Sequence, residues 1–146
     1  MKIEVSKEQL KEMILSAMFY SWVRGGLADQ KGEDFNQYEK LENFLLKIAD
    51  ENGFSDLAEK FHNTLVPTDE LSELLENTME EHDEDVFWHE LTTALGKRDF
   101  YRTVTKEEKK EMEEKNWLPD RIHTIYKKYE EEFEKHGIDR LDIKEK

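Results

Sequence analysis

The chain has 146 residues, of which 40% are charged and 36% hydrophobic, and its formal net charge is −14. Its three Trp, five Tyr and eight Phe exclude a disordered composition, and its length suits a single domain covering residues 1–146. The absence of cysteine excludes disulfides and thiolate metal sites and favours a reducing, cytoplasmic location.

The first element that the sequence predicts is a long N-terminal helix. Residues 1–5 are expected to form a short extended arm, and Ser6–Gln9 reads as a capping box. Gly25–Gly26 predicts that the helix ends at Arg24. Its last turns, Met18–Val23, are apolar on nearly every side, which predicts burial on several sides. The alternative is an exposed aromatic patch for a partner, which would favour a homodimer.

Short helices are expected to follow through the middle of the chain. Asp34 is a predicted cap for a second helix that ends at Asn52–Gly53. Ser55 is a predicted cap for a third, which ends before Pro67, and Thr68 is expected to start a fourth. No stretch has a convincing strand pattern. The expected fold is therefore all-α, a single-domain helical bundle of about six or seven helices.

The stretch from Leu71 to Leu95 permits two interpretations. A helical wheel gives it an apolar face and, opposite, a polar stripe that is in phase with the leucines before it. We expect a break near Glu81–Glu84, with a solvated acidic turn and a second helix ending at Gly96. The alternative is one long helix whose polar stripe lies inside a bundle. The expected apolar face consists of Phe87, Trp88, Leu91, Ala94 and Leu95.

The polar stripe contains the one candidate metal site. His82, Asp85 and His89 are spaced so that imidazole and carboxylate groups can face one divalent cation, with Glu81 assisting. A small metal-dependent helical-bundle enzyme is therefore the alternative function. The zinc-protease pattern fails, since the residue four after His89 is Thr93. No phosphate-binding loop or nucleophile elbow is present, so no other cofactor is expected.

A second candidate site lies in an expected linker, Lys97–Val104. It contains Arg98, Asp99, Tyr101 and Arg102, and such side chains supply forked donors and rigid aromatic contacts at protein interfaces. These four residues are therefore a candidate site for binding a partner. The alternative, which we favour, is that Arg98 and Arg102 pair with the acidic middle of the same chain.

Two more helices are expected before the C-terminus. Thr105–Glu108 is a second capping box, ahead of a surface helix held mainly by charge pairs. Trp117–Leu118 is expected to hold the chain to the core. Pro119 suits the start of the last helix, which Gly137 ends. Residues 138–146 are expected to form a polar tail.

The charge is concentrated in the middle of the chain. Residues 1–26 hold four bases and three acids, residues 27–95 hold four bases and nineteen acids, and residues 96–146 hold fourteen of each, so the three net charges are +1, −15 and 0. Such a field repels nucleic acid, and no apolar run approaches the ~18 residues that a membrane span needs. Plain solubility is one explanation of the charge. The function we expect is a non-enzymatic interaction module that binds a basic protein through this acidic middle or through the segment 97–102.

Overall fold

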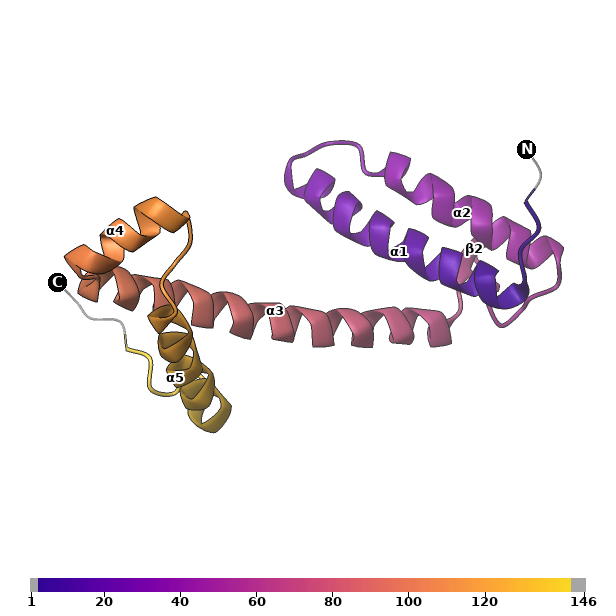
Figure 1. Ribbon diagram of the computed structural model, residues 1–146. Coiled ribbons are helices and arrows are strands. Elements are labelled where there is room, and N and C mark those ends of the chain that lie inside the picture. The colour runs from indigo at the N-terminus through magenta and orange to yellow at the C-terminus, as the bar shows by residue number, and fades with distance from the viewer. Residues whose placement is uncertain (1–2, 143–146) are drawn as a thin grey trace. The chain divides into compact units, whose positions relative to one another are not determined.

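The computed structural model describes residues 3–142, which form five helices and one two-stranded antiparallel sheet (Figure 1). The helical class is confirmed, but five helices replace the six or seven expected. None of the described helices is both long enough and apolar enough to cross a membrane. The elements are α1 (Lys7–Gln30), α2 (Asn36–Glu51), β1 (Ala58–Phe61), β2 (Thr64–Pro67), α3 (Asp69–Thr103), α4 (Lys106–Lys115) and α5 (Arg121–His136).

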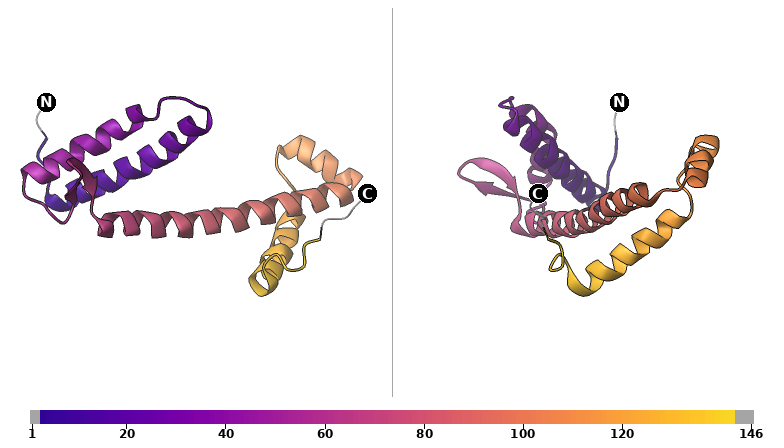
Figure 2. Two further views of the ribbon diagram at one scale, coloured as in Figure 1. Left: turned by 180° about the vertical axis from the view of Figure 1, so that it is seen from behind. Right: turned by 90° about the vertical axis from the view of Figure 1, so that its left-hand side faces the viewer.

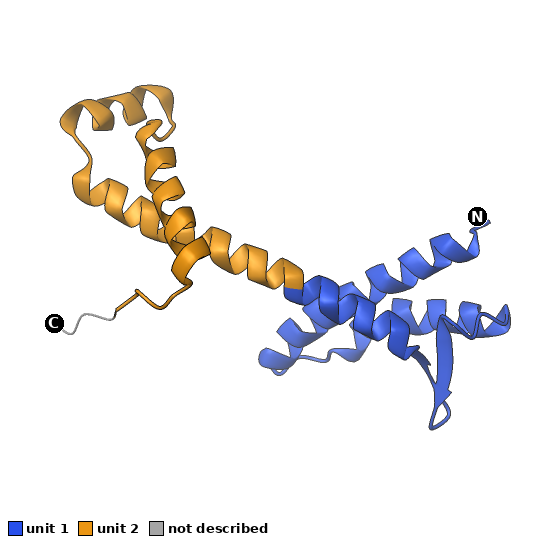
Figure 3. Ribbon diagram, turned by 90° about the horizontal axis from the view of Figure 1, so that it is seen from below, with its two compact units in different colours: residues 1–80 blue, residues 81–146 orange. Residues whose placement is uncertain are grey.

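The chain divides into two compact units, Met1–Glu80 and Glu81–Lys146 (Figure 3). Unit 1 contains α1, α2, the β1–β2 hairpin and the first turns of α3. Unit 2 contains the rest of α3 with α4 and α5. Whether the chain behaves as a single domain stays a prediction.

Helix α1 begins where the sequence predicts and continues past the predicted end. The Ser6 hydroxyl accepts a hydrogen bond from Gln9 N at 3.2 Å, and Gln9 Oε1 accepts one from Ser6 N at 2.8 Å. The predicted end at Arg24 is wrong, because the helix runs through both glycines to Gln30. Each glycine inside a helix costs about 1 kcal/mol relative to alanine. The buried Ala28 supplies packing beyond them.

Helices α1 and α2 lie side by side and antiparallel, as Figures 1 and 2 show. Their shared core also includes the start of α3 at Leu71. The predicted burial of Met18–Val23 is correct for Met18 but wrong for its aromatic residues. The exposed fractions of Phe19, Tyr20 and Trp22 are 45%, 48% and 59%. This part of α1 therefore follows the alternative, an exposed aromatic patch.

The predicted third helix is wrong, because residues 58–67 form the β1–β2 hairpin. The register places Ala58 opposite Pro67. His62 and Asn63 form the turn with φ values of 45° and 66°. Two successive left-handed residues make a turn whose twist matches that of antiparallel strands. The hairpin packs against α2 in unit 1.

A single helix, α3, replaces the two expected between Thr68 and Leu95. Its 35 residues include the predicted break at Glu81–Glu84 and the predicted stop at Gly96, so both of these predictions are wrong. The acidic run lacks proline and glycine, and glutamate is a strong helix former. The run is therefore a solvated helix rather than a solvated turn.

In unit 2, α5 packs closely against α3. A Cβ placed on Gly96 would lie 2.4 Å from Cδ1 of Tyr126, so the ring occupies the space that any side chain at position 96 would need. Nearby, the rings of Trp88 and Phe133 have centroids 5.6 Å apart. The side chains that these packings bury include Thr92, Phe100, Ile122 and Phe133.

Helix α4 has no buried residue and is held by polar contacts. The predicted capping box is confirmed: Glu108 N donates to Thr105 Oγ1 at 3.1 Å, and Thr105 N donates to Glu108 Oε2 at 2.9 Å. Glu108 also accepts hydrogen bonds from Arg121 Nε at 2.6 Å and Nη2 at 3.0 Å. The Arg121 guanidinium lies 4.8 Å above the centre of the Phe100 ring. One arginine thus joins α4 to α5 and α3.

The remaining connections differ from the prediction at one point. Trp117 is 70% exposed, so it does not hold the chain to the core, and Pro119 is the buried residue of that loop. Helix α5 ends as predicted, before Gly137 with φ of 54°. Residues 138–142 are exposed and belong to no helix or strand. Residues 143–146 of the predicted tail lie outside the described chain.

Candidate functional site

The predicted linker Lys97–Val104 lies almost entirely in the last turns of α3, where its charged residues contact one another. Asp99 Oδ1 accepts a hydrogen bond from Arg98 Nε at 2.8 Å and a longer one from Arg102 Nη1 at 3.5 Å. Asp99 Oδ2 accepts from the Tyr129 hydroxyl at 2.5 Å. The Tyr129 oxygen in turn accepts from Arg98 Nη2 at 3.1 Å.

These contacts shift the titration of the groups involved. The Arg98 and Tyr129 hydrogen bonds lower the pKa of Asp99 to about 2. Burial and the hydrogen bond to Asp99 raise the pKa of Tyr129. Both arginines therefore pair within the chain, as the alternative predicted, but their partner is Asp99 rather than the acidic middle. Arg102 makes only the longer of these contacts, and its side chain is 67% exposed. Binding of a partner by Arg98, Asp99, Tyr101 and Arg102 stays a prediction.

Tyr101, the fourth residue of that prediction, points instead to an apolar pocket. The pocket has a volume of about 430 Å³ and lies in unit 2, between the end of α3, α4 and the start of α5. Tyr101 and Trp117 line it and are both largely exposed. The other lining residues are Met112, Asn116, Leu118, Ile122, His123 and Tyr126. No lining side chain is a carboxylate, lysine or arginine, so the pocket suits an apolar group.

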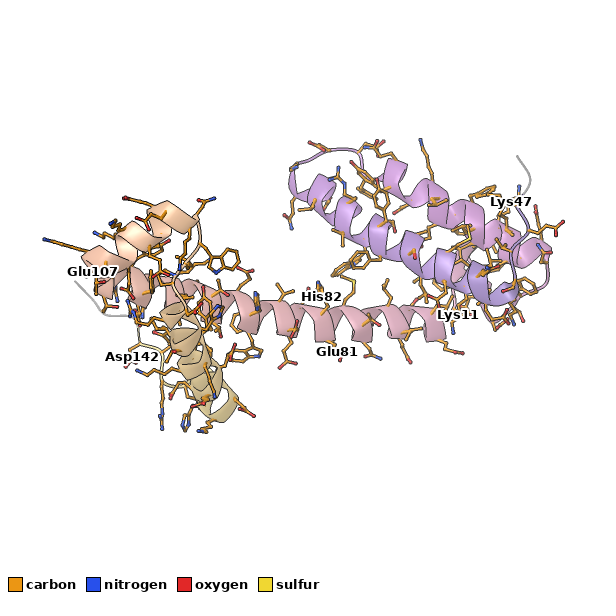
Figure 4. The ribbon with its side chains drawn as sticks, viewed as in Figure 1. Lys11, Lys47, Glu81, His82, Glu107 and Asp142 are labelled. Atoms are coloured by element: carbon orange, nitrogen blue, oxygen red, sulfur yellow. The ribbon has the colours of Figure 1, made fainter. Side chains whose placement is uncertain are left out.

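The three residues predicted to bind a metal lie on one exposed stretch of α3. His82, Asp85 and His89 share one continuous helix, but all three are exposed rather than inside a bundle. Figure 4 shows Glu81 and His82 leaving α3 in different directions. Among residues 3–142, no three His, Asp or Glu side chains are grouped so that they could hold a metal ion. The metal-dependent enzyme stays a prediction.

A different face of the same stretch combines acids with exposed apolar side chains. Phe87 was expected on the buried side of its helix, yet it is 50% exposed, and Val86 is 41% exposed. Helical spacings of three and four surround these two residues with carboxylates. We call this surface the acidic face of α3; it consists of Asp83, Glu84, Val86, Phe87 and Glu90, all exposed.

The carboxylates of the acidic face are not neutralised within the described chain. Asp83, Glu84 and Glu90 form no ion pair with any residue from 3 to 142. The reason lies in the sequence, since residues 61–96 contain ten acids and neither lysine nor arginine. Elsewhere in the protein, α4 pairs its acids with lysines four residues away, for example Glu111 with Lys115 at 2.6 Å. The acidic middle was predictable from composition; the exposed Phe87 within it was not.

Comparisons of the chain with protein-family models, with curated proteins and with solved structures find no match. The functional conclusion therefore depends on the chemistry of the surface alone.

Proposed function

We propose that this protein is a non-enzymatic, cytoplasmic interaction module whose acidic face of α3 binds a basic helical segment of another protein. The observation that supports this proposal is the exposed Phe87 surrounded by carboxylates that have no cationic partner among the described residues. A partner that covers this surface can bury the exposed Phe87 ring and supply cations for the carboxylates around it.

The chemistry of the surface defines the partner. Phe87 and Val86 require an apolar row on the partner, which a helix supplies at spacings of three and four. Asp83, Glu84 and Glu90 require lysine or arginine on either side of that row, as flanking charges do in paired helices. Long-range attraction by the acidic middle would also raise the association rate at low salt.

The direct test uses a synthetic helical peptide with leucines in one row and lysines on both sides, and a second peptide with glutamates in place of the lysines. We expect the lysine peptide to bind and the glutamate peptide not to bind, by titration calorimetry. Affinity should fall when sodium chloride is raised from about 50 mM to about 500 mM, because salt screens exposed charges. Binding of both peptides, or binding that is indifferent to salt, would contradict the proposal.

Two matched pairs of variants test whether the peptide binds at the acidic face of α3. Asp83→Asn, Glu84→Gln and Glu90→Gln together should weaken binding roughly 3- to 150-fold, at roughly 0.2–1 kcal/mol for each exposed pair. Glu130→Gln, Glu131→Gln and Glu134→Gln on α5 remove the same net charge and should have little effect. Equal weakening by both triple variants would mean that general charge, not this surface, attracts the peptide.

The apolar part is tested in the same way. Phe87→Ala should weaken binding of the lysine peptide, whereas Phe61→Ala on β1, where the side chain is 61% exposed, should leave it unchanged.

A further inference from the structure

Helices α1 and α2 expose a second apolar surface, in unit 1. It consists of five large side chains, each between 43% and 59% exposed. We call it the α1–α2 face; its members are Met13, Tyr20 and Leu27 on α1 and Leu41 and Phe44 on α2.

Helical spacing places these residues together, on a side that the core does not use. Met13, Tyr20 and Leu27 are seven residues apart and so form one row along α1, and Leu41 and Phe44 are neighbours on α2. A groove of about 300 Å³ runs between the two helices, with Met13 and Leu41 on its walls and Ala17 and Leu45 at its base. The groove therefore joins the two rows at the level of Met13 and Leu41.

We infer that a second copy of this chain covers the α1–α2 face, giving a two-fold symmetric, antiparallel four-helix bundle. The two-fold axis runs parallel to the helices, so that α1 of each copy packs on α2 of the other. Every neighbouring pair of helices is then antiparallel, the arrangement typical of four-helix bundles. A two-fold interface needs one surface that complements itself, and this face joins an acidic edge to a basic one.

Charged residues at the edges of the α1–α2 face favour a second copy of this chain over an unrelated apolar partner. Glu12 lines the groove on the α1 side and forms no ion pair among the described residues. Lys47 lies on the outer edge of α2, three residues after Phe44, and Figure 4 labels it near the end of that helix. Its ammonium group forms an exposed ion pair with Glu51 at 3.7 Å within the same helix, and a pair of this kind is weak enough to be exchanged for one with Glu12. Because Met13 and Leu45 border the same part of the groove, the proposed symmetry brings Glu12 to Lys47 of the second copy, twice in the dimer.

The size of the face sets the expected affinity. Helix α2 has 16 residues and is about 24 Å long, and two adjacent helices are about 20 Å wide, so the footprint is roughly 500 Å² before side-chain relief is counted. Stable complexes bury about 800 Å² on each partner. We expect a dimer of moderate affinity that separates on dilution.

Analytical ultracentrifugation of the full chain tests this inference. We expect twice the chain mass of 17.6 kDa at about 100 µM and progressive dissociation towards about 1 µM. Phe44→Glu should give a folded monomer by circular dichroism. Phe61→Glu changes an equally exposed phenylalanine outside the face and should leave the dimer intact. A monomer at every concentration, or a dimer that survives Phe44→Glu, would overturn the inference.

A charge exchange tests the arrangement itself. Glu12→Lys and Lys47→Glu should each weaken the dimer about tenfold, because each places like charges together at both ends of the interface. The double variant should restore association, since it exchanges the two charges. If the double variant is weaker than either single one, the antiparallel arrangement is wrong. The Asp83, Glu84 and Glu90 variants should not change the mass, which separates this inference from the proposed binding site on α3.

Discussion

At the scale of single residues, Gly96 is the glycine whose missing side chain leaves the least space, because the Tyr126 ring lies against it. Gly96 lies inside a helix, where alanine would otherwise be favoured by about 1 kcal/mol. A methyl group there would lie 2.4 Å from the Tyr126 ring. Overpacking of this kind costs about 1–3 kcal/mol. The steric term is the larger one, so α5 can approach α3 this closely only because position 96 is glycine.

We therefore predict that Gly96→Ala lowers the free energy of unfolding of unit 2 by up to about 2 kcal/mol, the steric cost less the gain in helix propensity. The matched control is Gly26→Ala, also inside a helix, where a Cβ would meet nothing within 4 Å. That variant should be neutral or stabilising. Urea unfolding measures both. In a Tyr126→Ala background, Gly96→Ala should no longer destabilise; a cost that persists there would contradict the proposed clash.

The glycines also show what residue-level reasoning can predict. Gly53 and Gly137 have positive φ next to helix ends, as the sequence indicates. Gly25 and Gly96 lie inside helices instead. A Cβ on Gly25 would lie 3.9 Å from Phe35 Cβ, an ordinary contact, whereas a Cβ on Gly96 would collide with the Tyr126 ring. Local sequence cannot distinguish a glycine that ends a helix from one that permits close approach of a distant element.

At the scale of elements, α4 depends on a single carboxylate that both caps it and joins it to α5. The hydrogen bonds from Arg121 and from Thr105 N lower the pKa of Glu108 from 4.5 to about 2. A carboxylate with a lowered pKa in the folded state contributes stability above its unfolded pKa. That contribution is complete above about pH 4.5 and is lost as the pH falls towards 2.

We predict that Glu108→Gln loosens α4 at neutral pH and that this effect shrinks as the pH falls from about 4.5 to about 2, where half of the Glu108 carboxyls are protonated. Glutamine can still cap the helix but carries no charge for Arg121, so the variant isolates the ion pair. Backbone chemical shifts of residues 106–115 across the pH range report the helix. Glu113→Gln is the control, since it is exposed on the same helix. A difference between wild type and Glu108→Gln that stays constant with pH would contradict this account.

The elements also differ in how well they could be predicted. Helix starts with capping boxes were correct at Ser6 and Thr105, because the signal is local and reciprocal. The β1–β2 hairpin was missed, since its turn is His62–Asn63 without glycine. The break in α3 was predicted from a change of apolar phase along the sequence. The helix continues because its acidic stretch needs no buried face to remain helical.

At the scale of the whole molecule, each unit has its own buried residues. The main core cluster extends from Leu10 to Leu71 and lies within unit 1. Unit 2 buries Phe100 and Ile122, which are 0% and 2% exposed. Each unit therefore has apolar contacts of its own that oppose its unfolding.

We predict that the two units have different stabilities in the same chain. Native-state hydrogen exchange should give one opening free energy for amides such as Ile14 and Leu45 and another for Phe100 and Ile122. Different denaturant dependence of the two sets would confirm separate cooperative units. A single opening free energy for both sets would contradict this and support the single domain that the length of the chain suggests.

The acidic face of α3 shows which parts of the candidate site the sequence can predict and which it cannot. Composition predicts where the negative charge lies, and the absence of lysine or arginine predicts that it stays unpaired. The position of Phe87 depends on which side of α3 the distant α5 covers. Trp88 meets Phe133 of α5, and Phe87, one residue earlier, is left exposed.

The stretch without lysine or arginine also determines how the protein can be cut. Trypsin cleaves only after those two residues, so it finds no site between Lys60 and Lys97. Residues 61–97 therefore leave a tryptic digest as one long acidic peptide that contains the hairpin turn and most of α3, including the boundary between the two units. A glutamate-specific protease has many sites in the same stretch, all on exposed residues. Protection of those sites by a bound basic partner would therefore be read directly in the fragments.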